Sequence, residues 1–566
     1  MRSRIFQFRQ HKISETNSLI SLFRRVGLLF RTIRFLKFEQ IFFRILKRFK
    51  SKKIFTSQKV ELSNRKPIQG FFRKKQSILE DNQFFFLNQK KELSFPNDWF
   101  SEGDSLLWKY NLHYFEGLIS DDTSPEIKTN LVNMWISSNS NRYSIGWDSY
   151  PLSLRITNWI KWVWIYETKL DTKVSNSLYS QAKFLSKNLE YHLLGNHLLE
   201  NSKALIFAGY FFKGKEAELW ISKGIRILKK ECARQILDDG GHFELSPMYH
   251  SIILELIHDI YLLSISIDAP RILSKQSKFL KSKMISMTNW LEKMIHNDDE
   301  IALFNDAAFG IATEPRKLID KIKRDFSIKL DEIGDCEFLK DTGYLRLSKG
   351  KSILFFDLAE IGARYLPGHG HADTLSIELS VFGQRLITNL GTSEYGNGQR
   401  RIFERSTKAH STVELNDQNS SEVWDGFRVG RRAKVFDIKI QKNKEKIFVE
   451  AKHNGYRFLK RGLIHKRKIE LFEDSLIIYD QVTKNVKSYL SRFHIHPCIK
   501  VELIGEKNGK FIFPNNDVVF WEAKTDEVLL KDVLFAPQFN ILQNTKTLIL
   551  KNNKSIDTML KIYWKK

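Results

Sequence analysis

Residues 367–373 of this 566-residue chain have the sequence Pro-Gly-His-Gly-His-Ala-Asp, and they lie between short strand-like runs. Two histidines separated by one glycine cannot both point into a core when the segment is extended, so His369 and His371 either share a face as ligands or flank a substrate. The glycines on both sides of His369 let a backbone come close to a bound molecule. We interpret this stretch as a functional site; the alternative is a polar hairpin with surface histidines.

The hydrophobic pattern of the chain changes near residue 335. Alternating apolar runs punctuated by Gly, Asn and Asp predict short antiparallel strands after that point. These runs are 343–347, 352–358, 375–382, 435–440, 447–451 and 475–479. Before that point, apolar residues recur at helical spacing. The expected helices cover 175–190, 196–213, 216–237, 249–268 and 276–297.

The predicted fold class is therefore α+β and multidomain, with a layered helical domain followed by an antiparallel β-sandwich. A length of 566 residues favours two or three domains. We expect a basic, helical or irregular segment at 1–95, a helical domain at 96–330 and a sandwich at 335–566. Residues 51–95 are lysine-rich and poorly periodic, and we expect them to be linker-like or irregular.

The chain is strongly basic, with 91 Lys and Arg against 65 Asp and Glu and a formal net charge of +26. Such a surface attracts polyanions, which include nucleic acid, anionic membranes and acidic polysaccharides. No nucleic-acid recognition motif is found, so we expect no nucleic-acid partner. The three cysteines lie far apart in the sequence, and we expect free thiols.

The basic charge is concentrated at the N-terminus, where residues 1–60 hold 16 Lys and Arg against two Glu. No apolar run there has the length or composition of a signal peptide or a transmembrane helix. Residues 26–49 combine apolar residues at helical spacing with basic residues between them. We expect either peripheral contact with an anionic membrane or a basic helix that packs on its own domain. The expected compartment is cytoplasmic or membrane-associated.

Polar clusters in the helical half add candidate functional residues. In Asn196-His197-Leu-Leu-Glu200, the second and last side chains share a helix face; the alternative is an Asn cap with a solvated Glu. A glycine-turned loop, Gly241-His242-Phe-Glu244-Leu-Ser-Pro-Met-Tyr249, runs into the start of a helix. Phe304-Asn305-Asp306 is most simply a turn.

These motifs, followed by Gly368-His369-Gly-His371-Ala-Asp-Thr-Leu-Ser and Ala409-His410-Ser-Thr-Val, occur in an order that resembles the heparinase II/III family of polysaccharide lyases. The likeness covers most of residues 100–435. It implies an incomplete (α/α) toroid followed by an antiparallel β-sandwich. It also implies a bacterial carbon–oxygen lyase that cleaves uronic-acid polysaccharides by β-elimination, and it adds a periplasmic or secreted location as an alternative.

The resemblance assigns catalytic roles to four residues. The proton on C5 of a uronate becomes acidic only when the adjacent carboxylate is neutralised, and the resemblance gives this task to Asn196, assisted by His197. It implies Tyr249 as the acid, or as both acid and base, and His369 as the base. A tyrosine needs nearby positive charge to act as a phenolate.

Further residues are expected around the substrate and around a metal. Those expected to contact an anionic polysaccharide are Glu200, His242, Glu244, Arg364, Arg428 and Arg431. The resemblance also implies one structural divalent metal, zinc or calcium, away from proton transfer, and no organic cofactor. Its ligands would be His371, Asn389 and His410, although asparagine supplies no charge where the family has an acidic residue.

Two other functions stay open at this point. Helical toroids also support glycoside hydrolysis by paired carboxylates, for which Glu200 with Glu244 or Asp306 are available. A noncatalytic polyanion-binding protein of a surface-polysaccharide pathway is the second alternative. The oligomeric state and the identity of the sugar do not follow from the sequence.

Overall fold

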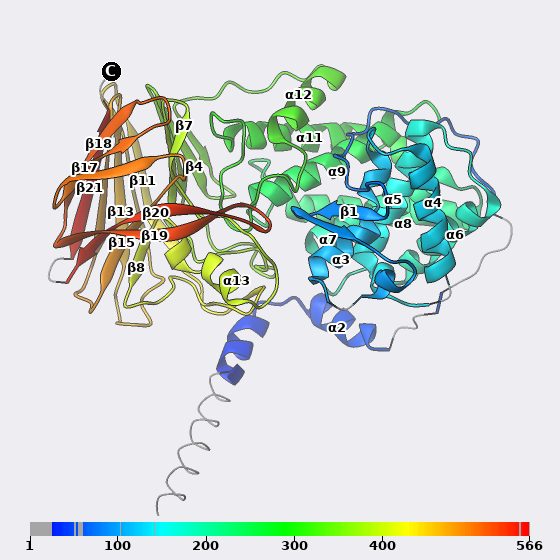
Figure 1. Ribbon diagram of the computed structural model, residues 1–566, viewed down its shortest axis with the longest axis horizontal. Coiled ribbons are helices and arrows are strands. Elements are labelled where there is room, and N and C mark those ends of the chain that lie inside the picture. The colour runs from blue at the N-terminus through cyan, green and yellow to red at the C-terminus, as the bar shows by residue number, and fades with distance from the viewer. Residues whose placement is uncertain are drawn as a thin grey trace, which may run out of the picture.

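The computed structural model describes residues 25–49, 53–54, 60–101, 103–140, 142–553 and 556–564. Helices fill the first half of the chain and antiparallel sheets the second (Figure 1). The helices are α2 (Phe38–Lys47), α3 (Leu106–Tyr114), α4 (Pro125–Asn139), α5 (Ser149–Tyr166), α6 (Thr172–Lys187), α7 (Gly195–Phe211), α8 (Lys215–Gln235), α9 (Pro247–Ile265), α10 (Arg271–Ser274), α11 (Ser277–Lys293), α12 (Pro315–Phe326) and α13 (Gln399–Glu404). The predicted fold class is confirmed.

The helical half is layered around α7 and α9. Helix α7 packs against α5 and α8, and α9 packs against α7 and α11. Helix α9 has the length and mean hydropathy of a membrane span, but 78% of its apolar window is buried inside the protein. Its Ser246 N-cap and Pro247 at the first position are typical helix-start residues, and they fix where the helix begins. Helix α9 is therefore a core helix of the toroid.

The sheet half is a sandwich of two antiparallel sheets. One sheet has eight strands in the order β11-β12-β13-β14-β21-β18-β17-β16, and the other has nine, in the order β19-β20-β15-β7-β6-β5-β4-β3 with β8 on β15. The first eight strands of this half are β3 (Cys336–Leu339), β4 (Tyr344–Lys349), β5 (Ser352–Asp357), β6 (Ile377–Val381), β7 (Gln384–Thr388), β8 (Val413–Leu415), β9 (Val423–Trp424) and β10 (Arg428–Val429). Strands β9 and β10 form a separate hairpin.

The remaining strands run to the end of the chain. They are β11 (Val435–Lys442), β12 (Lys446–His453), β13 (His465–Phe472), β14 (Ser475–Val482), β15 (Tyr489–Ile495), β16 (Lys500–Gly505), β17 (Asn508–Ile512), β18 (Val518–Lys524), β19 (Glu527–Gln538), β20 (Ile541–Asn552) and β21 (Asp557–Trp564). Strands β12 and β13 alternate buried and less buried positions, as expected for strands with one face on a core. Apolar side chains from both sheets form one buried cluster between them.

The segment from 60 to 95 has little regular secondary structure before residue 83, as the irregular alternative predicts, but it is not a free linker. It contains the hairpin β1 (Gln83–Phe86) and β2 (Gln89–Glu92), and it packs on the helical half (Figure 1). Phe71, Phe72 and Phe84 are at most 6% exposed and belong to the main helical core. Lysine dominates the composition of this segment, so its few aromatic residues give no periodic pattern in the sequence. Each of these aromatic residues nevertheless buries a large apolar area.

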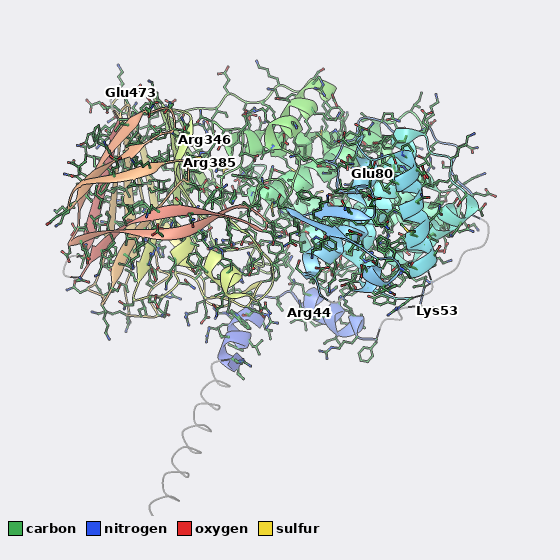
Figure 2. All side chains as sticks on the ribbon, viewed as in Figure 1. Arg44, Lys53, Glu80, Arg346, Arg385 and Glu473 are labelled. Atoms are coloured by element: carbon green, nitrogen blue, oxygen red, sulfur yellow. The ribbon has the colours of Figure 1, made fainter. Side chains whose placement is uncertain are left out.

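The two halves share a continuous interface. Trp290 and Phe304 from the helical half pack with Tyr344 and Phe355 from β4 and β5 in one buried cluster. Arg385 on β7 donates to the carbonyls of Glu300 and Ile301, at 2.9 and 2.8 Å. Figure 2 shows Arg385 at the side of the sheet that faces the helices.

A buried ion pair anchors the loop that carries His410. Arg467 on β13 is fully buried and binds both carboxylate oxygens of Asp480 at 2.7 Å. Its remaining Nη1 donates to the carbonyls of Leu375 and Ser411, each at 2.7 Å. Burial opposes ionisation of Asp480, but the Arg467 charge outweighs it and holds the pKa of that carboxyl well below its ordinary value.

We predict that Arg467→Met lowers the free energy of unfolding by about 3–5 kcal/mol, because it leaves a buried carboxylate without its partner. Urea denaturation measures this change. The matched control is Lys551→Met, which breaks the exposed Lys551–Glu527 pair and should cost less than about 1 kcal/mol. Equal effects of the two substitutions would contradict the assigned role of Arg467.

Candidate active site

The start of helix α7 brings an amide and a carboxylate together. Gly195 has a φ of +59°, and a Cβ there would lie 2.5 Å from Glu244 Oε1, so glycine permits the close approach. The Asn196 backbone N–H donates to Glu244 Oε1 at 3.1 Å, and Asn196 Nδ2 donates to Glu244 Oε2 at 2.9 Å. Asn196 is 3% exposed and Glu244 is 1% exposed. The amide predicted to neutralise charge is thus held by a buried carboxylate.

Tyr249 and His369 meet beside this pair. The Ser246 hydroxyl accepts the Tyr249 N–H and fixes the first turn of α9. The ring centroids of Tyr249 and His369 are 3.9 Å apart. His369 Nε2 lies 3.6 Å from Glu244 Oε2. The predicted site residues on α7, on α9 and in the loop between β5 and β6 therefore lie close together.

Asp306 organises the histidines of that loop. Its carboxylate is fully buried and lies 2.8 Å from His369 Nδ1 and 2.8 Å from His371 Nε2. Arg401 on α13 binds both carboxylate oxygens, with Nη2 at 2.7 Å from Oδ2. Burial opposes ionisation of Asp306, but Arg401 and the two histidine hydrogen bonds outweigh it and hold its pKa well below the ordinary value.

The neighbouring Asn305 joins the loops that carry the site. Its φ of +57° places it in the left-handed region that asparagine tolerates. Its Nδ2 donates to the Leu245 carbonyl at 2.8 Å, and its Oδ1 accepts the His371 N–H at 2.9 Å. The turn at 304–306 therefore connects the loop before α9 with the loop before β6.

His197 lies in the first turn of α7, beside a buried carboxylate. It lies 3.2 Å from Glu190 Oε1, and its ring centroid is 4.3 Å from that of Tyr150. Burial disfavours the imidazolium, but the Glu190 carboxylate outweighs burial and raises the pKa of His197 above 6.5. With 31% of its side chain exposed, His197 can reach a bound substrate. An imidazolium there suits the neutralisation of a substrate carboxylate.

Two tyrosines share a hydrogen bond at the mouth of the site. The Tyr249 and Tyr395 hydroxyl oxygens are 3.0 Å apart. Burial, together with the partner tyrosine, raises the pKa of Tyr249 well above 10. Burial also raises the pKa of Tyr395 well above 10, with the Asp306 charge adding to it. Both hydroxyls therefore keep their protons, and one of them donates to the other across this contact.

Three of the residues predicted to contact substrate lie inside the protein. Glu200 is 2% exposed and lies 4.0 Å from Lys203, in a buried charge network with Asp259. His242 is 1% exposed and its Nε2 lies 3.0 Å from Gln235 Oε1. Each of these two, like Glu244, has an internal polar partner, which offsets part of the cost of burying it.

The predicted arginines lie on the surface near the β9–β10 hairpin. Arg364 and Arg428 are exposed. Arg428 lies 3.4 Å from Asp425, and Arg431 lies 2.9 Å from Glu422. These partners leave Arg428 more available to a ligand than Arg431.

The residues predicted to hold a metal fit such a site poorly. His371 Nδ1 lies 3.2 Å from His410 Nε2, and Asn389 Oδ1 accepts the Ser411 N–H at 3.1 Å. Within the described ranges, no group of three His, Cys, Asp or Glu side chains could hold a metal ion. Asp306 contacts both His371 and His369, so a metal at His371 would lie one residue away from the predicted base. The metal itself stays a prediction.

The sequence analysis missed several groups of the site. The sequence predicts Asp306 as part of a turn or as a carboxylate for hydrolysis, and it assigns no individual role to Arg401 or Tyr395. Phe427, at the tip of the β9–β10 hairpin, is 43% exposed and its ring centroid lies 5.3 Å from that of Tyr395. The only local signal was the clustering of polar and aromatic residues at 391–395 and 427–432.

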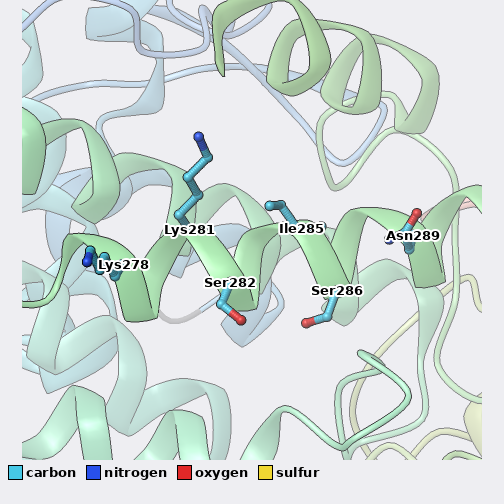
Figure 3. A pocket seen from close by; sticks show the side chains of 6 residues that line it. All are labelled: Lys278, Lys281, Ser282, Ile285, Ser286 and Asn289. Atoms are coloured by element: carbon cyan, nitrogen blue, oxygen red, sulfur yellow. The ribbon is translucent and has the colours of Figure 1, made fainter. Parts of the chain in front are cut away.

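A shallow groove elsewhere on the surface does not belong to this site. It follows the outer face of α11 (Figure 3). Its lining residues are Lys278, Lys281, Ser282, Ile285, Ser286 and Asn289. These side chains supply no acid–base pair, so we assign the groove no chemistry.

Comparisons with known proteins agree with this geometry. A family model described as "Heparinase II/III N-terminus" matches residues 157–327, and one described as "Heparinase II/III-like, C-terminal" matches residues 334–565. A heparin-sulfate lyase from Bacteroides stercoris is 25% identical over 345 residues, which are 54% of this chain and 46% of the relative. One from Pedobacter heparinus is 25% identical over 269 residues, 43% of this chain and 39% of the relative. The chain thus aligns with less than half the length of these relatives.

Solved structures show the same fold. The crystal structure of heparinase III has a TM-score of 0.67 at 16% identity, covering 92% of this chain and 88% of that one. The structure of heparan sulfate lyase from Pedobacter heparinus has a TM-score of 0.57 at 15% identity, covering 93% and 87%.

We predict that Asn389→Asp increases the zinc content of protein purified without an affinity tag, because it adds a charged oxygen ligand beside two imidazoles. Elemental analysis of the wild-type protein and the variant measures the zinc bound per chain. Asn389→Ala is the control for a change of packing alone. A wild-type protein that already holds one equivalent of zinc, with no gain in the variant, would contradict the poor fit.

Proposed function

The chain belongs to the heparinase II/III family, and we propose that it is a polysaccharide lyase that cleaves a uronic-acid-containing anionic polysaccharide by β-elimination. The observation that carries this proposal is the placement of Tyr249 and His369, with ring centroids 3.9 Å apart, beside Asn196. The curated relatives are heparin-sulfate lyases, which favours a heparan-sulfate-like substrate. An alginate-like or bacterial exopolysaccharide is the alternative within the same chemistry.

The first task is to neutralise the uronate carboxylate. His197, with its pKa raised above 6.5 by Glu190, supplies positive charge next to Asn196. A substrate carboxylate has to compete with Glu244 for the Asn196 amide, since Glu244 already accepts both of its donors. The amide and the imidazolium then stabilise the charge that develops on the carboxylate as the C5 proton leaves.

His369 is the base in this proposal. Its Nδ1 lies 2.8 Å from the ionised Asp306, so Nδ1 carries the proton and Nε2 presents a lone pair. Nε2 takes the C5 proton, and the electrons of the C5–H bond form the C4–C5 double bond. Asp306 is a positioning residue that fixes the tautomer and the ring orientation.

Tyr249 is the acid. Its raised pKa keeps the hydroxyl protonated and disfavours a phenolate base. As the C4–O bond breaks, the Tyr249 proton passes to the leaving glycosidic oxygen. The cycle closes when the His369 imidazolium releases the C5 proton and the Tyr249 phenolate takes up a proton, which restores both groups.

The buried carboxylates argue against hydrolysis. A glycosidase needs two carboxyl groups open to the glycosidic bond, one as acid and one as base or nucleophile. Glu200, Glu244 and Asp306 are at most 2% exposed. The last two are also fixed by internal donors, Glu244 by Asn196 and Asp306 by Arg401.

We predict that Tyr249→Phe lowers the rate of unsaturated-uronate formation by about a hundredfold or more, because it removes only the acid hydroxyl. His369→Ala should have a similar effect, and Asn196→Ala should cost about 3 kcal/mol of transition-state stabilisation. Ultraviolet absorbance, screened over heparan sulfate, chondroitin, hyaluronan, alginate and capsule preparations, is the measurement.

The control is Tyr479→Phe, which changes a tyrosine on β14 that is 37% exposed. Each variant must first melt like the wild-type protein. A folded Tyr249→Phe variant with the wild-type rate would refute the mechanism, and reducing sugar without unsaturated product would indicate hydrolysis. A folded wild-type protein that binds these polymers without cleaving them would support the noncatalytic alternative.

We also predict that Glu190→Gln shifts the alkaline limb of the kcat/KM profile to lower pH. Glu190 stabilises the His197 imidazolium and raises its pKa above 6.5, so its removal lets His197 lose its proton at lower pH. The substitution keeps an acceptor for Asn201 Nδ2, which lies 3.0 Å from Glu190 Oε2. An unchanged alkaline limb would show that the charge of His197 does not contribute.

A further inference from the structure

Residues 25–49 form a segment, called here the arm, that lies across both halves of the protein. Residues 25–33 are helical and α2 follows. The Arg31 guanidinium binds both carboxylate oxygens of Glu422, at 2.7 and 2.8 Å, next to the β9–β10 hairpin. Trp424 Nε1 donates to Thr32 Oγ1 at 3.1 Å. The first helix of the arm is therefore fixed to the sheet half.

The second helix of the arm is fixed to the helical half. The Phe43 ring stacks on Tyr191 with centroids 4.8 Å apart, and Lys47 Nζ lies 3.0 Å from His192 Nε2. Gln40 is the buried residue of α2, and its side chain donates to the Leu193 carbonyl at 3.4 Å. These contacts at both ends of the arm define its inner face, which packs on the protein. The opposite face of the arm points away from the protein.

The outward face is apolar. The most exposed side chains are Phe30 at 71%, Phe38 at 80% and Phe49 at 81%. Seven further large hydrophobic residues of the arm are at least 36% exposed: Val26, Leu29, Ile33, Ile41, Phe42, Ile45 and Leu46. Scattered exposed apolar residues are ordinary on a protein surface, but ten within 25 consecutive residues form a patch.

Basic residues are interspersed with this patch. Residues 25–49 contain seven Lys and Arg and one Glu; Arg31 and Lys47 make the inner contacts, and Arg25, Arg34, Arg44 and Arg48 are exposed. Figure 2 shows Arg44 on α2, at the edge of the molecule where the arm lies. A helical segment with exposed Phe, Leu and Ile and several Lys and Arg has the composition of a peptide that lies in the interface of an anionic bilayer.

We propose that the arm docks the protein on an anionic membrane surface, with its apolar side chains inserted between lipid headgroups and its basic side chains against lipid phosphates. A polysaccharide would match the charges but would leave ten apolar side chains in water. A second copy of the chain would cover the apolar face, but a symmetric interface would bring two basic segments together. Only a bilayer matches both features, and this proposal does not depend on the lyase activity.

The test is flotation of the full chain with vesicles of phosphatidylcholine and with vesicles that also contain phosphatidylglycerol. We expect binding to the second kind only. The triple variant Phe30→Ser, Phe38→Ser, Phe49→Ser should bind these vesicles at least about tenfold more weakly, because three exposed rings no longer enter the bilayer. The matched control is Leu219→Ser, Ile267→Ser, Ile504→Ser, at positions 66%, 88% and 64% exposed outside the arm, and it should bind like the wild-type protein.

Three outcomes would overturn the proposal. Wild-type protein that floats with neither kind of vesicle has no membrane affinity. Equal binding of the arm variant and the wild-type protein would show that the contact is electrostatic and that the apolar side chains do not contribute to it. A wild-type dimer that becomes a monomer in the arm variant, measured by light scattering and without vesicle binding, would assign the patch to a second copy of the chain. Lyase activity of each variant on soluble substrate, measured in parallel, separates this test from that of the proposed function.

Discussion

Asp306 is a carboxylate without contact with water, so it needs charged or hydrogen-bonding partners inside the protein. Its partners are Arg401 from α13 and the two histidines of the loop between β5 and β6. Asp306 itself belongs to a turn between α11 and α12 of the helical half. The orientation of His369 therefore exists only where the helical half and the sheet half are docked. The apolar cluster of Trp290, Phe304 and Tyr344 therefore contributes to the arrangement of the site, because it holds the helical half and the sheet half in contact.

The elements and the main catalytic candidates could be predicted because their signals are local. Helical spacing located α6 to α9, and alternation located β4, β5 and β12 to within a few residues. Asn196 and Tyr249 each occupy the first turn of a helix, where the preceding glycine or Ser-Pro pair marks the start. A residue at a helix start has its backbone direction fixed by the sequence around it. Its approximate place on the rim of the helical half could therefore be inferred without knowledge of its distant neighbours.

The remaining parts of the site depend on distant partners and left little local signal. Asp306 lies 63 residues before His369 and 95 before Arg401, and its own neighbours resemble an ordinary turn. Polar residue type suggested substrate contact for Glu200 and His242, but internal partners allow both to be buried. The same reasoning failed in the opposite direction for residues 60–95, whose lysines concealed three core phenylalanines. Whether a polar side chain is buried depends on its partners in the folded protein, and a single sequence does not show which residues those partners are.

The net charge of +26 comes from two parts of the chain, the N-terminal segment and the remainder, which have to be interpreted separately. Residues 1–60 carry more than half of it, with 16 Lys and Arg against two Glu, and Arg31 and Lys47 of that segment contact Glu422 and His192. The candidate site contains the carboxylates of Glu190, Glu244 and Asp306, countered by His197 and Arg401. Bulk basicity is thus weak support for a polyanionic substrate. That support has to come from individual cations at the rim, and Arg364 and Arg428 suit it better than Arg431, whose guanidinium is already paired with Glu422.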